Sequence, residues 1–233
     1  MSSMTQPYDI YRTHMVEFKL RLNHAERIAS AKSPITGLSA LDAEFCFLQI
    51  RRLIELITFS AALRDEGRYK RLRELQRIEN QRDHGDHSKD WEAPEILKRL
   101  SEISLHSLPI PIKRIGQLGT SELQIDLVDV SVTHGRLIEI YKKCGGYLHA
   151  RNPLGKDFAR LVEVERKKYE GAHAEIRRCL AFFRKLMWHH AAISLDWSDE
   201  LNPRDLADPR AAWLVDFGGE GTQEVSMTLA DAK

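Results

Sequence analysis

A histidine, an arginine and an asparagine lie close together in the stretch Cys144–Pro153: His149, Arg151 and Asn152. Histidine changes its charge near neutral pH, and the arginine fork matches the oxygens of a phosphate. These side chains could therefore bind a phosphate and transfer a proton. Because Pro153 favours the end of a helix, a second interpretation is that His149 and Arg151 bond to the last helical carbonyl groups. Both interpretations stay open.

Arg184 and His189, five positions apart, form a second candidate catalytic pair. In a phosphate-cleaving site the arginine would stabilise developing charge and the histidine would act as acid or base. Roughly one such pair is expected by chance in a chain this rich in arginine and histidine, which is the weakness of any short motif. The alternative is that His189 and His190 cap the end of a long helix.

A polar stripe crosses the otherwise apolar segment 39–66. Glu44, Arg51, Glu55 and Thr58 recur at helical spacing, so they share one side of the predicted helix. Since a buried charge without a partner is costly, Arg51 and Glu55 are expected to pair. As a functional site, Glu44, Arg51 and Glu55 would line a ligand-binding cleft in which Arg51 faces a phosphate or carboxylate. The alternative is an ion-pair network that only fixes helix packing.

One loop concentrates residues that bind metals: Asp83, His84, Asp86 and His87. Two imidazoles and two carboxylates could hold a divalent cation. The spacing matches no specific metal-binding motif, and charged loops are usually solvated. A divalent-metal site and a solvated charged loop are therefore the two interpretations of this segment, and no cofactor is expected.

Hydrophobic periodicity predicts the helices that position these residues. Apolar residues spaced by three and four predict a helix over residues 8–32 that ends before Pro34. Residues 39–66 are apolar on almost every side, which predicts a central helix buried by several neighbours. It is expected to begin with a capping box at Ser39 and to end at Gly67.

Further helices are expected over residues 68–82, 94–104, 136–149 and 157–193. The helix over 68–82 is basic and is expected to be an exposed, solvated face, and Gly171 is expected to kink or split the last one. The central helix and residues 136–153 are expected to pack together.

Alternating patterns around glycines predict two β-hairpins, an insertion at about 108–128 and a C-terminal hairpin at about 211–230. Pro109 and Pro111 would confine the first hairpin to a sheet edge. The fold class is therefore mainly α: a helical bundle around the buried helix 39–66, with these two hairpins. The bundle domain is expected to span 1–193, with the tail 194–233 docked on it.

The charge, the cysteines and the apolar runs of the sequence indicate where the protein is expected to work. The formal charge is +1, but residues 194–233 carry three basic and nine acidic side chains, a net −6, which leaves +7 for residues 1–193. Three cysteines without a CxxC pair favour a reducing compartment. No apolar run is long enough to span a membrane, and no signal peptide is visible, so a cytoplasmic protein with no membrane partner is expected.

The order of elements resembles bacterial all-helical proteins of HEPN-like type. The resemblance covers residues 8–66 and 130–192: a long first helix, a buried helix with the Arg51–Glu55 pair, and a helix that closes on His149-Ala-Arg-Asn-Pro. It implies a small, often dimeric bundle linked to stress or phage defence. Active members are similar to metal-independent ribonucleases with an Arg-polar-x-x-x-His motif, whose spacing Arg184–His189 matches. His149 and Arg151 depart from that motif, because the histidine comes first.

The sequence contains no GxGxxG after a strand, no P-loop, no GxSxG and no HExxH motif. The preferred function is a regulatory or interaction module that forms a homo-oligomer, a dimer, with RNA or another protein as a further partner. The alternative is a metal-independent endoribonuclease that uses His149 or His189 with Arg151 or Arg184, and the third is a divalent-metal-binding protein.

Overall fold

A computed structural model of the chain describes residues 5–80, 86–113, 132–149, 163, 167–195, 204 and 209–231. Its helices are α1 (Thr5–Ala29), α2 (Ser39–Arg64), α3 (Glu66–Asn80), α4 (Ala93–Ile103), α5 (His134–Leu148) and α7 (Ala172–Met187), with 3-10 turns at His87–Lys89 and Leu105–Ser107. Its strands are β1 (Ile110–Pro111), β2 (His189–Leu195), β3 (Pro209–Asp216) and β4 (Ser226–Asp231).

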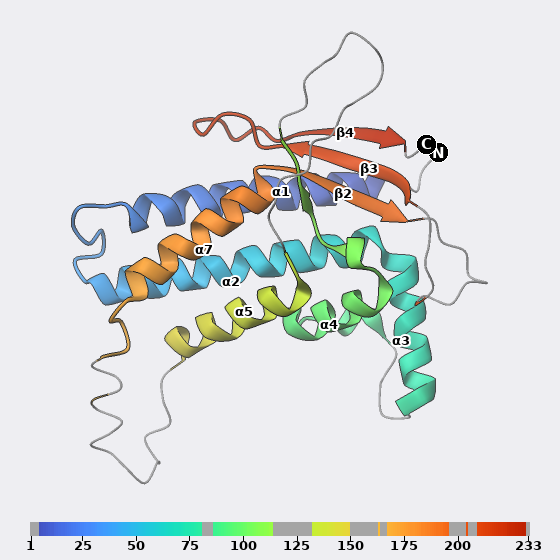
Figure 1. The fold of residues 1–233 in the computed structure, drawn as a ribbon, viewed down its shortest axis with the longest axis horizontal. Coiled ribbons are helices and arrows are strands. Elements are labelled where there is room, and N and C mark those ends of the chain that lie inside the picture. Colours follow the sequence, from blue (N-terminus) through green and yellow to red (C-terminus); the bar gives the residue numbers. More distant parts are fainter. Residues whose placement is uncertain are drawn as a thin grey trace.

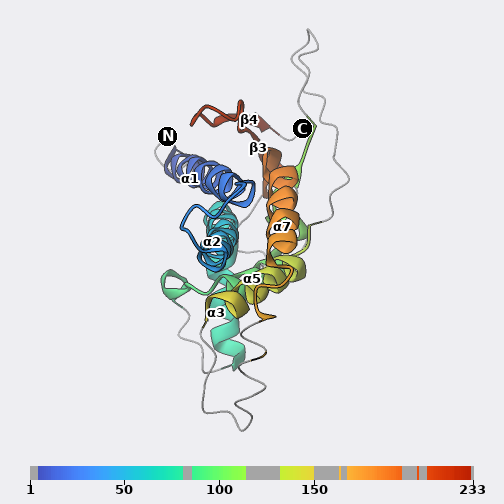
Figure 2. The same cartoon turned by 90° about the vertical axis from the view of Figure 1, so that its left-hand side faces the viewer.

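The predicted fold class, mainly α with a small β component, is confirmed (Figure 1). Helix α2 runs through the middle of the molecule and packs against α1, α4, α5 and α7. The two views agree that α1 and α5 lie on opposite sides of α2, and that the sheet covers the side of α1 that faces away from α2 (Figures 1 and 2).

Helix α1 forms where its periodicity predicts it. The apolar residues at alternating spacings of four and three are all buried: Tyr11, Met15, Phe18, Leu22, Ala25 and Ala29. This row packs into the main hydrophobic core together with α2, α5 and α7. The helix ends at Ala29, a few residues before Pro34.

Helix α2 is central and is buried by several neighbours, as predicted, although not all of its apolar residues are covered. One of its faces points to solvent, and Phe45 and Leu48 on that face are exposed. The predicted capping box at Ser39 does not form, because Asp42 instead accepts hydrogen bonds from the backbone amides of Ile35 and Thr36 at 2.7 and 3.0 Å. These bonds hold the pKa of Asp42 below its usual value, although its burial works in the opposite direction.

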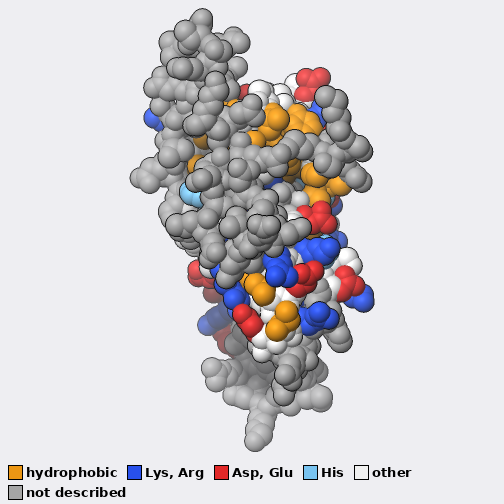
Figure 3. Space-filling model, turned by 90° about the vertical axis from the view of Figure 1, so that its right-hand side faces the viewer, with side chains coloured by type: hydrophobic (Ala, Val, Ile, Leu, Met, Phe, Trp, Pro, Cys, Tyr) orange, Lys and Arg blue, Asp and Glu red, His pale blue; other side chains and the backbone are white. Residues whose placement is uncertain are grey.

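The end of α2 also differs from the prediction. The helix stops at Arg64, Asp65 follows, and Gly67 lies inside α3. Helix α3 is less exposed than expected, since Arg68 and Arg73 are buried, and Arg73 Nε lies 2.8 Å from Asp90. Figure 3 shows acidic and basic side chains interspersed over the described surface at this end of the molecule.

The helix predicted over 157–193 is described only in part: Glu163 and Lys167 are helical, residues 168–171 form a turn, and α7 follows. Gly171, at φ +75°, precedes α7, and the helix ends at Met187. Residues 189–195 form strand β2 instead, paired with β1 and β3. His189 and His190 therefore belong to a strand and do not cap a helix. Pairing with distant strands overrides the local helical pattern here.

The sheet is antiparallel, with strand order β1-β2-β3-β4. The C-terminal hairpin is confirmed: β3 pairs with β4 from Ala211↔Asp231 to Asp216↔Ser226. Pro111 lies in β1, at an edge of the described sheet, as expected for a residue without an amide hydrogen. Of the predicted insertion hairpin, residues 114–131 lie outside the described residues, and Ile110–Pro111 pairs with β2.

Buried polar contacts attach the hairpin β3–β4 to α1. The fully buried ammonium group of Lys19 donates to the carbonyl oxygen of Phe217, to Thr222 Oγ1 at 3.2 Å and to the carbonyl oxygen of Glu224 at 3.0 Å. Tyr8 adds a bond from its hydroxyl to the carbonyl oxygen of Met227 at 2.8 Å. In the part of the chain that the structure describes, no helix combines the length and the apolarity needed to span a membrane.

Candidate ligand-binding pocket between α2 and α5

An open pocket of about 670 Å³ lies where α2, α5 and the start of α4 meet. This volume is within the usual range for small-molecule sites. Below it is called the α2–α5 pocket. The side chains and backbone around it come from three separate parts of the chain: Arg51, Trp91, Glu92, Pro94, Tyr141, Lys142, Gly145, Gly146 and His149.

Packing between α2 and α5 places these residues. The guanidinium carbon of Arg51 lies 4.3 Å from the centre of the Tyr141 ring, and the ring of Phe47 stacks on that of Tyr147 with 3.8 Å between centres. The prediction that residues 39–66 pack against 136–153 is confirmed for the described part of both segments. Arg51 and His149 line the same pocket as a result.

Glu55 lies behind Arg51 and shares its carboxylate among three donors. It accepts from Arg52 at 2.7 Å and from the Tyr141 hydroxyl at 3.1 Å, whereas Arg51 Nε lies 3.5 Å away. Burial, and next the nearby carboxylate of Glu55, raise the pKa of Tyr141. Arg51 and Glu55 thus pair as predicted, but the contact is long, and the five N–H donors of Arg51 are far from saturated by it.

Two further cationic or ionisable side chains lie around the pocket. Among the described residues, the side chains of Lys142 and His149 have no hydrogen-bond or ion-pair partner. His149 lies at the end of α5, and its backbone amide bonds to the carbonyl oxygen of Gly145 at 3.0 Å, so its predicted place at a helix end is confirmed. A Cβ atom at Gly146 would meet no atom within 4 Å, which shows how open this side of α5 is.

The remaining part of the pocket comes from the residues that lead into α4. Trp91 is 71% exposed, the most exposed of the large hydrophobic side chains that the structure describes, and it lines the pocket together with Glu92 and Pro94. Asp90, immediately before it, accepts hydrogen bonds from Tyr69 at 2.7 Å and from Arg73 at 3.1 Å. These buried contacts hold the segment against α3 and so position Trp91.

The other members of the predicted polar stripe lie elsewhere. Glu44 accepts a hydrogen bond from Tyr169 and does not line the pocket. Thr58 is buried and donates to the carbonyl oxygen of Ile54 at 2.8 Å, an ordinary bond within the helix. Arg151 and Asn152, predicted to act with His149, lie outside the described residues.

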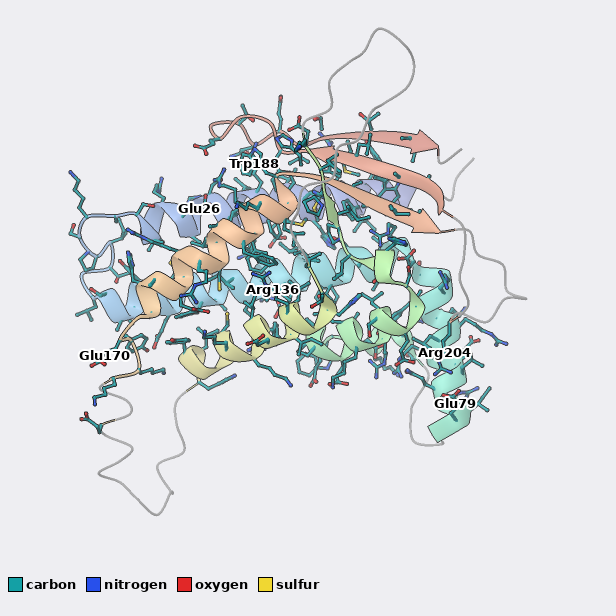
Figure 4. All side chains as sticks on the ribbon, in the orientation of Figure 1. Glu26, Glu79, Arg136, Glu170, Trp188 and Arg204 are labelled. Atoms are coloured by element: carbon teal, nitrogen blue, oxygen red, sulfur yellow. The ribbon has the colours of Figure 1, made fainter. Side chains whose placement is uncertain are left out.

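Arg184 and His189, the second predicted catalytic pair, contact other residues in the structure. Arg184 forms two hydrogen bonds with the carboxylate of Glu26 and a further ion pair with Glu220 at 3.0 Å, and it covers the Trp188 ring at 4.0 Å. Figure 4 shows Glu26 and Trp188 near one another on α1 and at the end of α7. His189 Nδ1 lies 3.1 Å from Asp216. Both side chains have structural partners that account for their positions.

The candidate metal loop is only half described. Asp83 and His84 lie outside the described residues. Asp86 caps a short turn, accepting from the amide and hydroxyl of Ser88, and these bonds together with Lys89 lower its pKa to about 2. His87 Nε2 lies 3.4 Å from Glu66. No group of three or more metal-ligating side chains occurs among the described residues.

Comparison with known proteins finds no matching family model, no matching curated protein and no matching solved structure. The HEPN-like resemblance therefore stays a prediction.

Among the pocket residues that sequence reasoning missed are Trp91, Glu92, Tyr141 and Lys142. For Trp91 a signal exists, because a tryptophan between polar residues just before a helix-initiating proline has no apolar periodicity to bury it. Tyr141 follows the apolar row of its helix, with Leu137 and Cys144, and it is buried there. Nothing local distinguishes Lys142 from any other surface lysine.

Proposed function

We propose that this protein is a helical binding module that recognises a nucleoside phosphate, free or at an end of single-stranded RNA, in the α2–α5 pocket. The observation that carries the proposal is the placement of Arg51, Lys142 and His149 around one pocket together with the exposed ring of Trp91.

The charges support an anionic ligand. Three cationic or ionisable side chains line the pocket, against the single carboxylate of Glu92. Arg51 is backed by Glu55 and Tyr141, so its planar fork is held in place for a phosphate. A pre-positioned arginine loses less side-chain freedom on binding than a mobile one.

The aromatic ring supports a planar group on the same ligand. Trp91 has no ring partner among the described residues, whereas the ring of Trp213 contacts those of Tyr8 and Tyr11, and the ring of Trp188 contacts that of Phe217, with 5.2–5.9 Å between ring centres. Stacking of a base on such a ring contributes about 1–3 kcal/mol and depends little on base identity. Glu92 would then accept hydrogen bonds from ribose hydroxyls or a base amino group.

The same geometry favours binding over catalysis. Of the pair with ribonuclease-like spacing, Arg184 forms an ion pair with Glu26, and His189 Nδ1 lies 3.1 Å from the carboxylate of Asp216. His149 is the one predicted catalytic histidine that lines the pocket. The endoribonuclease alternative therefore rests on His149, and the test below includes it.

Binding of a labelled, short single-stranded RNA, followed by fluorescence anisotropy in EDTA, tests the proposal, with AMP as competitor. Arg51→Ala should weaken binding tenfold or more, because one charge-assisted hydrogen bond contributes about 1.5–3 kcal/mol. Arg52→Ala is the matched control, since Arg52 also bonds to Glu55 but does not line the pocket. Competition by AMP indicates a mononucleotide site, and its failure where RNA binds indicates a strand site.

Two outcomes would contradict the proposal. If neither RNA nor AMP binds, or if Arg51→Ala and Arg52→Ala bind alike, the pocket is not the site. If the RNA is cut in EDTA and His149→Ala abolishes the cutting, the protein is a nuclease and not a binding module.

A further inference from the structure

The face of α2 that points to solvent carries a row of large apolar side chains. Leu38, Leu41, Phe45 and Leu48, called here the α2 stripe, are 60%, 47%, 38% and 43% exposed. With Ile35 just before the helix, they make up five of the nine exposed large hydrophobic residues of the described chain. A contiguous apolar row of this kind marks an interaction surface, whereas single exposed apolar residues do not.

The neighbours of α2 leave this face uncovered. Helices α1, α4, α5 and α7 contact α2, and in Figure 2 α7 lies to its right, whereas Leu38, Leu41, Phe45 and Leu48 stay exposed. The core-facing side of α2 is filled by Phe47, Ile50, Leu53, Ile54 and Ile57, all almost fully buried. The residues of the α2 stripe therefore do not contribute to the hydrophobic core of a single chain.

From this row we infer that the α2 stripe binds the same stripe of a second copy of the chain, with the two α2 helices antiparallel. The spacings between successive stripe residues are three, four and three, which read the same in both directions. An antiparallel copy centred on residue 43 therefore places Leu38 opposite the partner's Leu48 and Leu41 opposite the partner's Phe45. Spacings of three and four are also those of helices that pack along a common seam.

Charge decides between the antiparallel and the parallel arrangement. Arg52 follows the stripe by four residues, and its side chain is 56% exposed. A parallel pair would bring the two Arg52 side chains together, and like charges side by side disfavour association. The antiparallel pair separates them to opposite ends of the interface. A two-fold pair of this kind is also closed, so it stops at a dimer.

Light scattering coupled to size exclusion measures the oligomeric state. The wild type should have twice the mass of the chain, and Leu41→Glu and Phe45→Glu should each have the mass of one chain, with unchanged circular dichroism and melting temperature. Ile78→Glu, at an exposed position on α3, is the matched control and should remain a dimer. A monomeric wild type at every concentration, or dimeric stripe variants, would overturn the inference.

Disulfide trapping tests the orientation. The three native cysteines are buried, and burial raises the pKa of Cys46 and Cys144 to about 12, so they should not cross-link copies. Separately purified Leu38→Cys and Leu48→Cys proteins should form a covalent dimer only when mixed. In the antiparallel pair, residue 38 of one copy lies about 15 Å along the helix from residue 38 of the other, and the same holds for residue 48. This distance is too long for a disulfide. Cross-linking of either variant with itself would contradict the antiparallel pair.

The dimer does not depend on the proposed ligand. Phe45→Glu leaves all residues of the α2–α5 pocket in place, so loss of the dimer with RNA binding retained separates the two proposals.

Discussion

The guanidinium of Arg51 stacks on the ring of Tyr141, 4.3 Å from its centre, while the Tyr141 hydroxyl donates to Glu55 at 3.1 Å. One tyrosine on α5 thus contacts both members of an ion pair on α2. This contact joins the two helices and turns the arginine toward the pocket that they share with Trp91. The same three residues therefore stabilise the fold and shape the candidate site.

Filling the pocket should abolish binding without weakening the fold. In Gly146→Leu the new side chain enters open space on α5, and a leucine in place of a helical glycine adds up to about 1 kcal/mol to the free energy of unfolding. RNA binding should fall below detection. Gly219→Leu, in the turn between β3 and β4, has equally open surroundings and should bind like the wild type.

Chemical denaturation and anisotropy measured on the same two variants check this prediction. If Gly146→Leu binds RNA as tightly as Gly219→Leu, the ligand does not enter the α2–α5 pocket.

Asp90 should control both stability and the pocket. Its carboxylate accepts from Tyr69 and Arg73 in nearly buried surroundings, and Trp91 follows it directly. Removing one partner of a buried ion pair costs about 3–5 kcal/mol, so Asp90→Ala should lower the free energy of unfolding by that amount. Glu95→Ala, whose carboxylate forms an exposed pair with Lys98 on α4, is the control and should change stability by less than about 1 kcal/mol.

Lys19 should be needed to keep the C-terminal hairpin on α1. Lys19→Met retains the apolar part of the side chain but leaves the buried carbonyl oxygen of Phe217 and the part-buried one of Glu224 without their donor, so we expect a loss of about 3 kcal/mol in the free energy of unfolding. Hydrogen exchange of the β3 and β4 amides should accelerate more than that of the amides in α2. Equal effects on both elements would argue against a local docking role.

The buried histidines His134 and His190 should make the fold acid-sensitive. Burial lowers the pKa of each to about 4, and each bonds as a neutral ring, His134 to Ser107 and His190 to Tyr11. With an ordinary value near 6.5 in the unfolded chain, the unfolded state binds more protons between these two pH values. The contribution of these histidines to the free energy of unfolding is therefore fully present above about pH 6.5. It falls toward pH 4, by up to about 3 kcal/mol for each histidine.

Urea denaturation between pH 7 and pH 4.5 measures this slope, in a window where most carboxylates are still ionised. His190→Gln should be less stable at pH 7 but should lose less stability on acidification than the wild type. His24→Gln, at an exposed position, should leave the slope unchanged. If the free energy of unfolding of His190→Gln falls with pH as steeply as that of the wild type, His190 does not cause the acid sensitivity.

The sequence predicts the helices well, because each apolar row recurs at helical spacing and is enough to bury one face. Helix α1 follows this rule from Tyr11 to Ala29. Prediction from helical periodicity fails at residues 189–195. The local sequence shows no alternation typical of a strand, and pairing with β1 and β3 determines the conformation. Periodicity also fails for Phe45 and Leu48, since composition shows that a face is apolar but not whether a neighbour within the same chain covers it.

The candidate site could be predicted only in part, for a similar reason. Arg51 and His149 stand out by residue type, and both line the pocket. Trp91 joins them only because Asp90 ties its loop to α3, and no local pattern encodes that contact. Arg184 and His189 show the reverse case: their spacing matches a motif, but the structure places Arg184 against Glu26 and His189 against Asp216.

The most direct test of the central claim is the fluorescence of Trp91 during a titration with AMP. A base that stacks on Trp91 should quench the emission of the wild type, whereas Trp91→Phe should bind AMP with similar affinity but show no quenching. The other three tryptophans are present in both proteins and so serve as an internal reference. Quenching that persists in Trp91→Phe, or no quenching of the wild type at saturating AMP, would contradict nucleotide binding in the α2–α5 pocket.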